Sequence, residues 1–153
     1  MKGLGTALIT PFMEDGTIDF QSLSAMIEHH VNGGVDYLVI MGTTSEAPTI
    51  THEEQDQIIA YVVKQVAGRV PLVLGVGGNS TAAVVQRLEE LSERLLKDFA
   101  AILSVTPYYN RPQQEGLYLH FSAVAEASPV PVILYNVPKR TGVNLLPETT
   151  RRI

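Results

Sequence analysis

Residues 37–66 read YLVIMGTTSEAPTITHEEQDQIIAYVVKQV and contain a complete strand, turn and helix pattern. The run Tyr37–Met41 is continuously apolar, as in strands that are covered on both faces of a parallel sheet. Thr51 and Glu54 have the spacing of a capping box, which marks the start of a helix. The apolar face of this helix is predicted to comprise Ile58, Ile59, Val62, Val63 and Val66. The stretch therefore predicts one βα unit with a polar turn, Gly42–Glu46, between its two elements.

The same pattern recurs on both sides of this unit. Four more apolar runs predict buried strands, at Leu4–Ile9, Leu72–Val76, Ala101–Val105 and Val132–Tyr135. Helix starts are expected between and after them, at Asp19, Ser80 or Thr81, Gln113 and Pro147. The first of these helices is expected to end at Gly33-Gly34, and the second to carry apolar residues as far as Leu95.

Strand starts that recur about every 30 residues, each followed by a helix, indicate an α/β fold with a parallel sheet and right-handed crossovers. Two architectures fit: an open doubly wound sheet, or a partial (β/α)8 TIM barrel with about five βα units. Polar residues gather after the strands in both. A dinucleotide-binding sheet would place its glycine signature after the first strand, where this chain has only Thr10-Pro11. The missing glycine signature favours the barrel.

The bulk composition excludes several functional classes. A net charge of −5 and the lack of a basic stripe argue against nucleic acid or an anionic membrane as a partner. The chain has no cysteine, which rules out disulfides and thiolate metal sites, and its histidines show no metal-ligand spacing. No apolar run approaches the roughly 18–20 residues that span a bilayer, and the N-terminus is a poor signal peptide. A soluble, cytoplasmic protein without a metal is expected.

Three loops after predicted strands carry residues that can do chemistry. Thr43 and Thr44 lie in the Gly42–Glu46 turn, which can hold a carboxylate or phosphate; the alternative is a turn whose hydroxyls satisfy its own backbone. Tyr108 and Tyr109 lie in a loop bracketed by prolines. Two exposed aromatic rings on such a loop indicate a binding site or an interface; the alternative is that both rings pack as lids on the fold.

The third loop begins at the end of the last predicted strand. Tyr135 stands at the end of an otherwise aliphatic run, where a phenol can relay protons or simply belong to the core. Arg140 follows in the same loop and can hold a carboxylate with its planar guanidinium, or lie on the surface.

Three motifs, in order and spacing, resemble the dihydrodipicolinate synthase and N-acetylneuraminate lyase family, and its synthase branch in particular. They are GTTSE (42–46), the block from Thr106 to Tyr118 that begins TPYYNRP, and YNVPKRTG (135–142). The resemblance runs from Ile9 to Thr149. It implies a (β/α)8 TIM barrel, with residues 1–153 as the N-terminal part of a single catalytic domain. It also implies an assembly that is usually a homotetramer, and no cofactor. It also implies condensation of pyruvate with aspartate semialdehyde through a lysine imine, for lysine and diaminopimelate biosynthesis.

The resemblance also implies roles for single residues. Thr43 and Tyr135 match the hydroxyls of a proton relay, and Tyr109 matches the tyrosine that completes this relay in a neighbouring subunit. Thr44 matches the holder of the pyruvate carboxylate, and Arg140 the residue that binds the carboxylate of the aldehyde substrate.

The chain departs from the family pattern at two points. Ser45 stands where the motif commonly has glycine, which is harmless if the turn needs no positive φ. The family's imine lysine lies on a sixth strand, and this chain ends at Ile153, before it. The chain alone is therefore expected to be inactive, and to self-associate or pair with a complementary C-terminal fragment. Two other functions stay open: a non-catalytic partial-barrel or open α/β scaffold, and a related pyruvate aldolase such as N-acetylneuraminate lyase.

Many synthases of this family bind lysine as an inhibitor at a cleft between subunits, and the resemblance also points to those positions. They match His52 or Gln55, Asn79, Ala83 and Tyr108. Ala83 stands where the family has a glutamate that pairs with the ammonium group of lysine. We therefore expect an intact parent enzyme to be nearly insensitive to lysine, unless Glu89 or Glu90 replaces the missing carboxylate.

Overall fold

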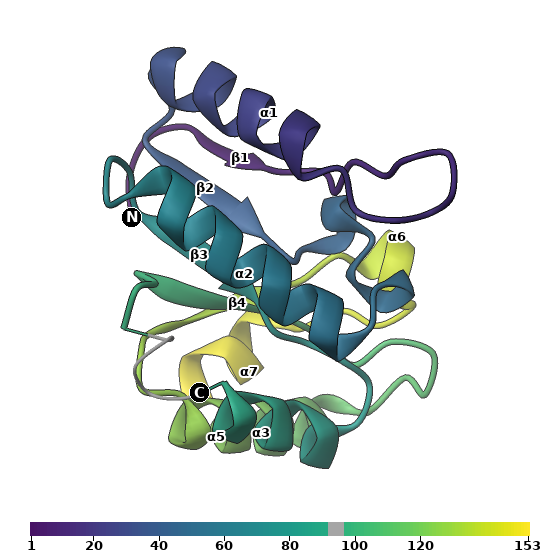
Figure 1. Cartoon of the computed structure of the whole chain (residues 1–153). Helices are drawn as coiled ribbons and strands as arrows, with labels where there is room; N and C mark the ends of the chain where they lie inside the picture. The colour runs from purple at the N-terminus through teal and green to yellow at the C-terminus, as the bar shows by residue number, and fades with distance from the viewer. Residues whose placement is uncertain (92–96) are drawn as a thin grey trace. The chain divides into compact units, whose positions relative to one another are not determined.

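The computed structural model describes residues 1–91 and 97–153 (Figure 1). The chain divides into two compact units, Met1–Leu74 and Gly75–Ile153. In both units, parallel strands alternate with helices, as the spacing of the apolar runs predicts. None of the helices in these described ranges is long and apolar enough to cross a membrane.

The first unit is built on parallel strands in chain order. Strand β1 (Gly5–Ala7) pairs with β2 (Tyr37–Ile40), and β2 pairs with β3 (Leu72–Gly75). Helices α1 (Phe20–Asn32) and α2 (His52–Val66) contact each other. Their inward faces are fully buried and comprise Leu23, Ile27, Ile58, Ile59, Val62 and Val66. Burial of this apolar surface is the main force that holds the unit together.

Local sequence signals set the ends of both helices. The side chain of Asp19 accepts a hydrogen bond from the backbone N–H of Ser22 at 2.9 Å, which identifies it as the N-cap of α1. Hydrogen bonds from Ser22 also hold the pKa of Asp19 below its usual value. Thr51 and Glu54 form the reciprocal bonds of a capping box at the start of α2. The predicted helix starts and the Gly33-Gly34 end are confirmed.

The second unit contains β4 (Ala101–Val105) and β5 (Val132–Tyr135), which pair in parallel with the bounds that the sequence predicts. Helices α3 (Thr81–Glu90) and α5 (Gln114–Ala127) pack against each other, and α7 (Pro147–Arg152) packs on α5 (Figure 1). Leu117 and Phe121 of α5 form a buried cluster with Leu145. Ser80 and Gln113 are N-caps, and Pro147 opens α7, as expected.

The structure corrects the bounds of three expected strands and adds a short helix. The strand predicted at Tyr37–Met41 ends at Ile40, because Met41 has a φ of 54°, outside extended geometry. The strands expected at Leu4–Ile9 and Leu72–Val76 are shorter, at Gly5–Ala7 and Leu72–Gly75. A four-residue helix, α6 (Pro138–Thr141), was not expected from its pattern. Leu95, predicted on the α3 helix, lies outside the described residues.

Candidate functional site

The Gly42–Glu46 turn follows β2 directly in the first unit. Thr43–Ser45 form a single turn of 3-10 helix, η1, closed by Ser45 N–H to Gly42 O at 3.1 Å and Glu46 N–H to Thr43 O at 3.2 Å. Thr43 and Thr44 are exposed, and their hydroxyls bond to no residue in ranges 1–91 and 97–153. The two threonines thus leave their hydroxyls available to a ligand.

Ser45 points the other way from these threonines. Its side chain is buried, and its Oγ donates to the carbonyl oxygen of Leu8 at 2.8 Å. Its own carbonyl oxygen accepts a hydrogen bond from Thr10 Oγ1 at 2.9 Å. Ser45 does not have a positive φ, so the serine fits this turn without backbone strain. Serine in place of glycine is therefore compatible with the turn, because the condition set by the sequence, that the turn needs no positive φ, is met.

The loop after β4 holds Tyr109 away from the protein. Tyr109 is 89% exposed and has a φ of 72°, which is unusual for a residue other than glycine. Asn110 anchors the loop, because its side-chain amide donates to the carbonyl oxygen of Asn79 at 2.9 Å. Tyr108 is half-buried. Of the two tyrosines, Tyr109 is not a packing lid, and its ring is free to contact another molecule.

The loop after β5 carries Tyr135 and Arg140. Tyr135 ends β5, in register with Val105, and its backbone carbonyl accepts a hydrogen bond from Thr106 N–H at 3.1 Å. Its ring is half-buried, and its hydroxyl makes no hydrogen bond within the described part of the chain. Arg140 lies on α6, exposed, and its guanidinium has no partner among the same residues. Both side chains can therefore bind a ligand from solvent.

Two side chains that the sequence argument overlooked shape this loop. Asn136 bridges it, donating to Asn144 Oδ1 at 2.8 Å and accepting from Leu145 N–H at 3.0 Å. Thr141 is buried, and its hydroxyl is within hydrogen-bonding distance of the carbonyl oxygens of Val137 and Val143. An asparagine directly after a strand and a threonine before Gly142 are the local signals that could have indicated such supports.

Of the positions matched to the effector cleft, His52 and Gln55 belong to the first unit, and Asn79, Ala83 and Tyr108 belong to the second. His52 is the first residue of α2 and is exposed, whereas the Gln55 side chain donates to the carbonyl oxygens of Ala47 and Ile50, both at 3.1 Å. Gln55 is thus occupied in holding the start of α2. Asn79 and Ala83 are exposed at and just after the start of α3.

The residues that could replace the missing effector carboxylate are less suited to that role. Glu90 accepts a hydrogen bond from Gln86 at 2.8 Å and lies 3.9 Å from Arg87, so its charge is already partnered. Glu89 is six positions after Ala83, which places it on a different face of the helix.

The structure also shows where the lysines and acidic groups lie. All four lysines, Lys2, Lys64, Lys97 and Lys139, are exposed. No group of three histidine, cysteine, aspartate or glutamate side chains that could hold a metal ion occurs in the described ranges. The residues with available hydroxyl, phenol and guanidinium groups lie after β2, β4 and β5, at the carboxyl ends of parallel strands. Parallel α/β proteins place their ligand sites at these ends.

Solved structures of similar proteins define the class of protein to which the fold corresponds. A synthase crystal structure from Acinetobacter baumannii, described as chloride-inhibited and complexed with pyruvate, superposes with a TM-score of 0.92 at 43% identity, covering 98% of this chain and 50% of that one. A structure of the enzyme from Cyanidioschyzon merolae with lysine bound gives a TM-score of 0.89 at 36% identity, covering 97% and 50%. The fold is that of a (β/α)8 barrel synthase, present in part, as expected.

The family follows from the sequence comparison. The dihydrodipicolinate synthetase family matches residues 1–153, and the chain belongs to it. The 4-hydroxy-tetrahydrodipicolinate synthase of Parabacteroides distasonis is 53% identical over 153 residues, covering 100% of this chain and 50% of that protein. The chain therefore spans about half the length of the curated relatives it matches.

Proposed function

We propose that this chain is the N-terminal part of a 4-hydroxy-tetrahydrodipicolinate synthase domain, acting in lysine and diaminopimelate biosynthesis in the cytoplasm. In this lyase reaction, a lysine outside the chain forms an imine with the carbonyl carbon of pyruvate and releases water. The enamine formed from the imine then adds to the aldehyde carbon of aspartate semialdehyde. Cyclisation of the adduct gives the product and frees the lysine.

The chain's own residues supply proton transfer and carboxylate binding in this proposal. Thr43, Tyr135 and Tyr109 act as the proton relay, with Tyr109 serving the site of a neighbouring subunit. Thr44 holds the pyruvate carboxylate through its hydroxyl and the turn backbone, and Arg140 holds the carboxylate of the aldehyde substrate. Neither substrate requires a metal or cofactor from this chain.

The proposal depends on the exposure of these five side chains and on their lack of hydrogen-bond partners in the described ranges. Four of them, Thr43, Thr44, Tyr109 and Arg140, are exposed, and Tyr135 is half-buried. None of their hydroxyls or guanidinium donors is used within the described ranges, although each lies in or beside a segment that other hydrogen bonds hold in place. Polar groups that are positioned but unpaired are available to bind a substrate.

Exposed apolar residues support a role for association. Among residues 1–91 and 97–153, strand β1 pairs only with β2 and β5 pairs only with β4, so each has an open edge. Leu4 is 65% exposed beside β1, and Ile133 lies exposed on β5. Open edges and exposed apolar side chains favour a further protein partner, either another copy or a complementary C-terminal fragment. A self-associating scaffold without activity is the second candidate function for the chain by itself.

A chimaera tests the enzyme proposal. Residues 1–153 are joined to the complementary half of the Parabacteroides distasonis synthase, and condensation of pyruvate with aspartate semialdehyde is measured. We expect activity in the chimaera and its loss by at least a hundredfold in Tyr135→Phe, in line with the roughly 10²–10⁴-fold effect of a proton-transfer group. Tyr118→Phe, which alters a tyrosine on α5, is the matched control and should stay active. A folded chimaera without activity, or one indifferent to Tyr135→Phe, contradicts the proposal.

A further inference from the structure

Two buried hydrogen bonds hold the Thr43–Thr44 turn to the segment that follows β1. Thr10 Oγ1 donates to the carbonyl oxygen of Ser45 at 2.9 Å, and Ser45 Oγ donates to the carbonyl oxygen of Leu8 at 2.8 Å. The partners are 35 and 37 positions apart in the chain. Thr10 and Ser45 are both buried, at 5% and 2% exposed, so water does not compete for these bonds.

The turn needs such an anchor because its own backbone is unfavourable. Met41 and Glu46, on either side of η1, have φ values of 54° and 57°, in the left-handed region that disfavours residues with a Cβ. The local bonds that close η1 are long, at 3.1 and 3.2 Å, and single 3-10 turns are weakly stable. Strain of this kind persists where the surrounding structure imposes it.

Three consecutive hydroxyls in this turn divide into two kinds. Thr43 and Thr44 face solvent with their hydroxyls unpaired inside the described ranges, while Ser45 turns inward and bonds to Leu8, the residue after β1. The inward residue therefore determines where the outward hydroxyls sit relative to the strand. A glycine at position 45 would keep the bond from Thr10 to the backbone but lose the bond to Leu8.

We propose that Thr10 and Ser45 are positioning residues that hold the Thr43 and Thr44 hydroxyls in place. The role of those hydroxyls toward pyruvate rests on the proposed function; the anchoring of the turn does not. Thr10 and Ser45 touch no substrate in this proposal, and act only through the turn.

Hydrogen exchange read by mass spectrometry on the 153-residue chain tests the anchor. Thr10→Val and Ser45→Gly each remove one bond, and neither adds volume to the core. We expect peptides that span Met41–Ile50 to exchange about fivefold faster in each variant, the effect of losing one ordinary hydrogen bond, and faster still in the double variant. Thr10→Ser keeps the hydroxyl and should restore slow exchange.

Tyr61→Phe is the matched control. It removes a hydrogen bond of similar length, from Tyr61 Oη to Phe20 O at 3.0 Å, in the same unit. The global unfolding free energy of Tyr61→Phe in urea should fall about as far as that of the Thr10 and Ser45 variants. The exchange rate of peptides that span residues 41–50 should not change. Unchanged exchange in the double variant, or an equal rise in Tyr61→Phe, overturns the proposal. If Thr10→Val unfolds the chain, Ser45→Gly decides, because it removes the bond to Leu8 without adding volume to the core.

Activity of the chimaera separates this proposal from the proposed function. With an active chimaera, Ser45→Gly and Thr10→Val should lower kcat/KM for pyruvate, and Thr10→Ser should restore it. An unchanged kcat/KM counts against positioning of the hydroxyls. An inactive chimaera contradicts the proposed function, while the exchange result still decides whether Thr10 and Ser45 anchor the turn.

Discussion

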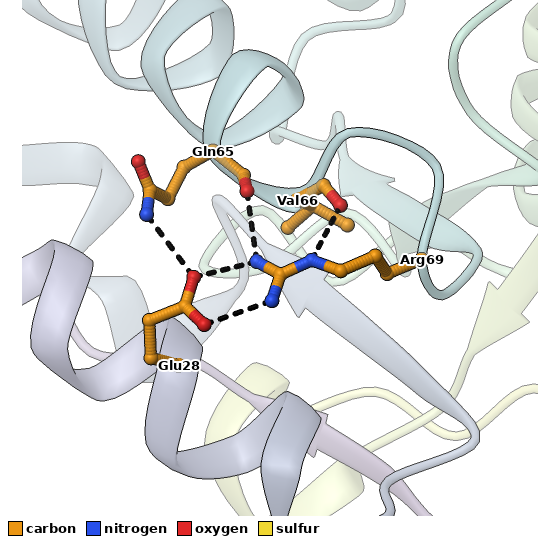
Figure 2. A network of polar contacts seen from close by, with 4 residues as sticks. All are labelled: Glu28, Gln65, Val66 and Arg69. Atoms are coloured by element: carbon orange, nitrogen blue, oxygen red, sulfur yellow. Dashed lines mark hydrogen bonds and ion pairs between the residues drawn. The ribbon is translucent and has the colours of Figure 1, made fainter.

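Arg69 binds the carboxylate of Glu28 through two parallel hydrogen bonds, from Nη1 to Oε2 at 2.8 Å and from Nη2 to Oε1 at 2.6 Å (Figure 2). Glu28 lies on α1, and Arg69 lies just after α2, 41 positions along the chain. Arg69 also donates to the carbonyl oxygens of Gln65 and Val66, the last turn of α2. The same guanidinium therefore caps α2 and ties it to α1.

The Glu28–Arg69 pair makes the unfolding free energy depend on pH in the acid range. The hydrogen bonds from Arg69, and then from Gln65, lower the pKa of Glu28 from 4.5 to about 2. A lowered folded-state pKa contributes stability above pH 4.5, and this contribution is lost as pH falls toward 2. We expect Glu28→Gln to have a lower unfolding free energy than wild type at pH 7, as measured by urea unfolding. At pH 2.5 the difference in unfolding free energy between the two proteins should be smaller. A loss of unfolding free energy in Glu28→Gln that is as large at pH 2.5 as at pH 7 would contradict the assignment.

His120 gives a second pH dependence, near neutrality. It is buried on α5, Nδ1 lies 2.9 Å from Thr81 Oγ1, and Nε2 has no partner in the described structure. Burial lowers the pKa of His120 below 6.5, so the unfolded chain binds the proton more readily than the folded one. Stability should therefore fall as pH drops through 6.5. His120→Gln should flatten this part of the curve of unfolding free energy against pH. A curve as steep as that of the unsubstituted chain would contradict the assignment.

Gly142 and Arg111 form a contact that a single methyl group can probe. Gly142 has a φ of 73°, and a Cβ there would lie 3.0 Å from Arg111 Nε. Gly16, with a φ of 86° and nothing within 4 Å, shares the backbone strain without the contact. Gly16→Ala should cost about 1 kcal/mol, and Gly142→Ala more. Adding Arg111→Ala should remove the excess for Gly142→Ala in a thermal denaturation series; an excess that persists would mean that Arg111 is not its cause.

Imine formation tests the catalytic limits of the isolated chain. A lysine becomes a nucleophile near neutral pH when its ammonium group is removed from water, and all four lysines here are exposed. We expect no pyruvyl adduct after treatment with pyruvate and borohydride, as measured by intact mass. The chimaera with the complementary half of the relative should gain the mass of one reduced pyruvyl group. An adduct on Lys139 of the isolated chain would show that this reasoning is wrong.

Lysine inhibition tests the effector positions in an active protein that contains this chain. We propose that Ala83 makes such a protein nearly insensitive, because loss of a close charge partner costs about 2–5 kcal/mol, or roughly thirtyfold or more in affinity. Glu90 is engaged by Gln86 and Arg87, so it does not compensate. Ala83→Glu should introduce inhibition in a lysine titration of activity, and Ala82→Glu, one position away, should not. Inhibition of the unsubstituted protein below millimolar lysine would contradict the charge argument.

The sequence alone was sufficient wherever the determining interactions are local. The N-cap at Asp19, the capping box of Thr51 and Glu54, and Pro147 at the start of α7 act within a few residues, so their spacing predicts them. The continuous apolar runs likewise predicted parallel strands and thus the loops where the candidate site residues lie. Family membership required only the order of three motifs.

Tertiary structure decided how distant segments hold those loops. Nothing near Ser45 in the sequence shows that its hydroxyl turns inward to Leu8, and nothing near Glu28 indicates Arg69 as its partner. Such pairs depend on strand register and on the way helices pack, which place residues more than 30 positions apart within hydrogen-bonding distance. The left-handed backbone at Met41 and Tyr109 has the same origin. Local preference disfavours that conformation for these residues, so the contacts of the folded chain must impose it.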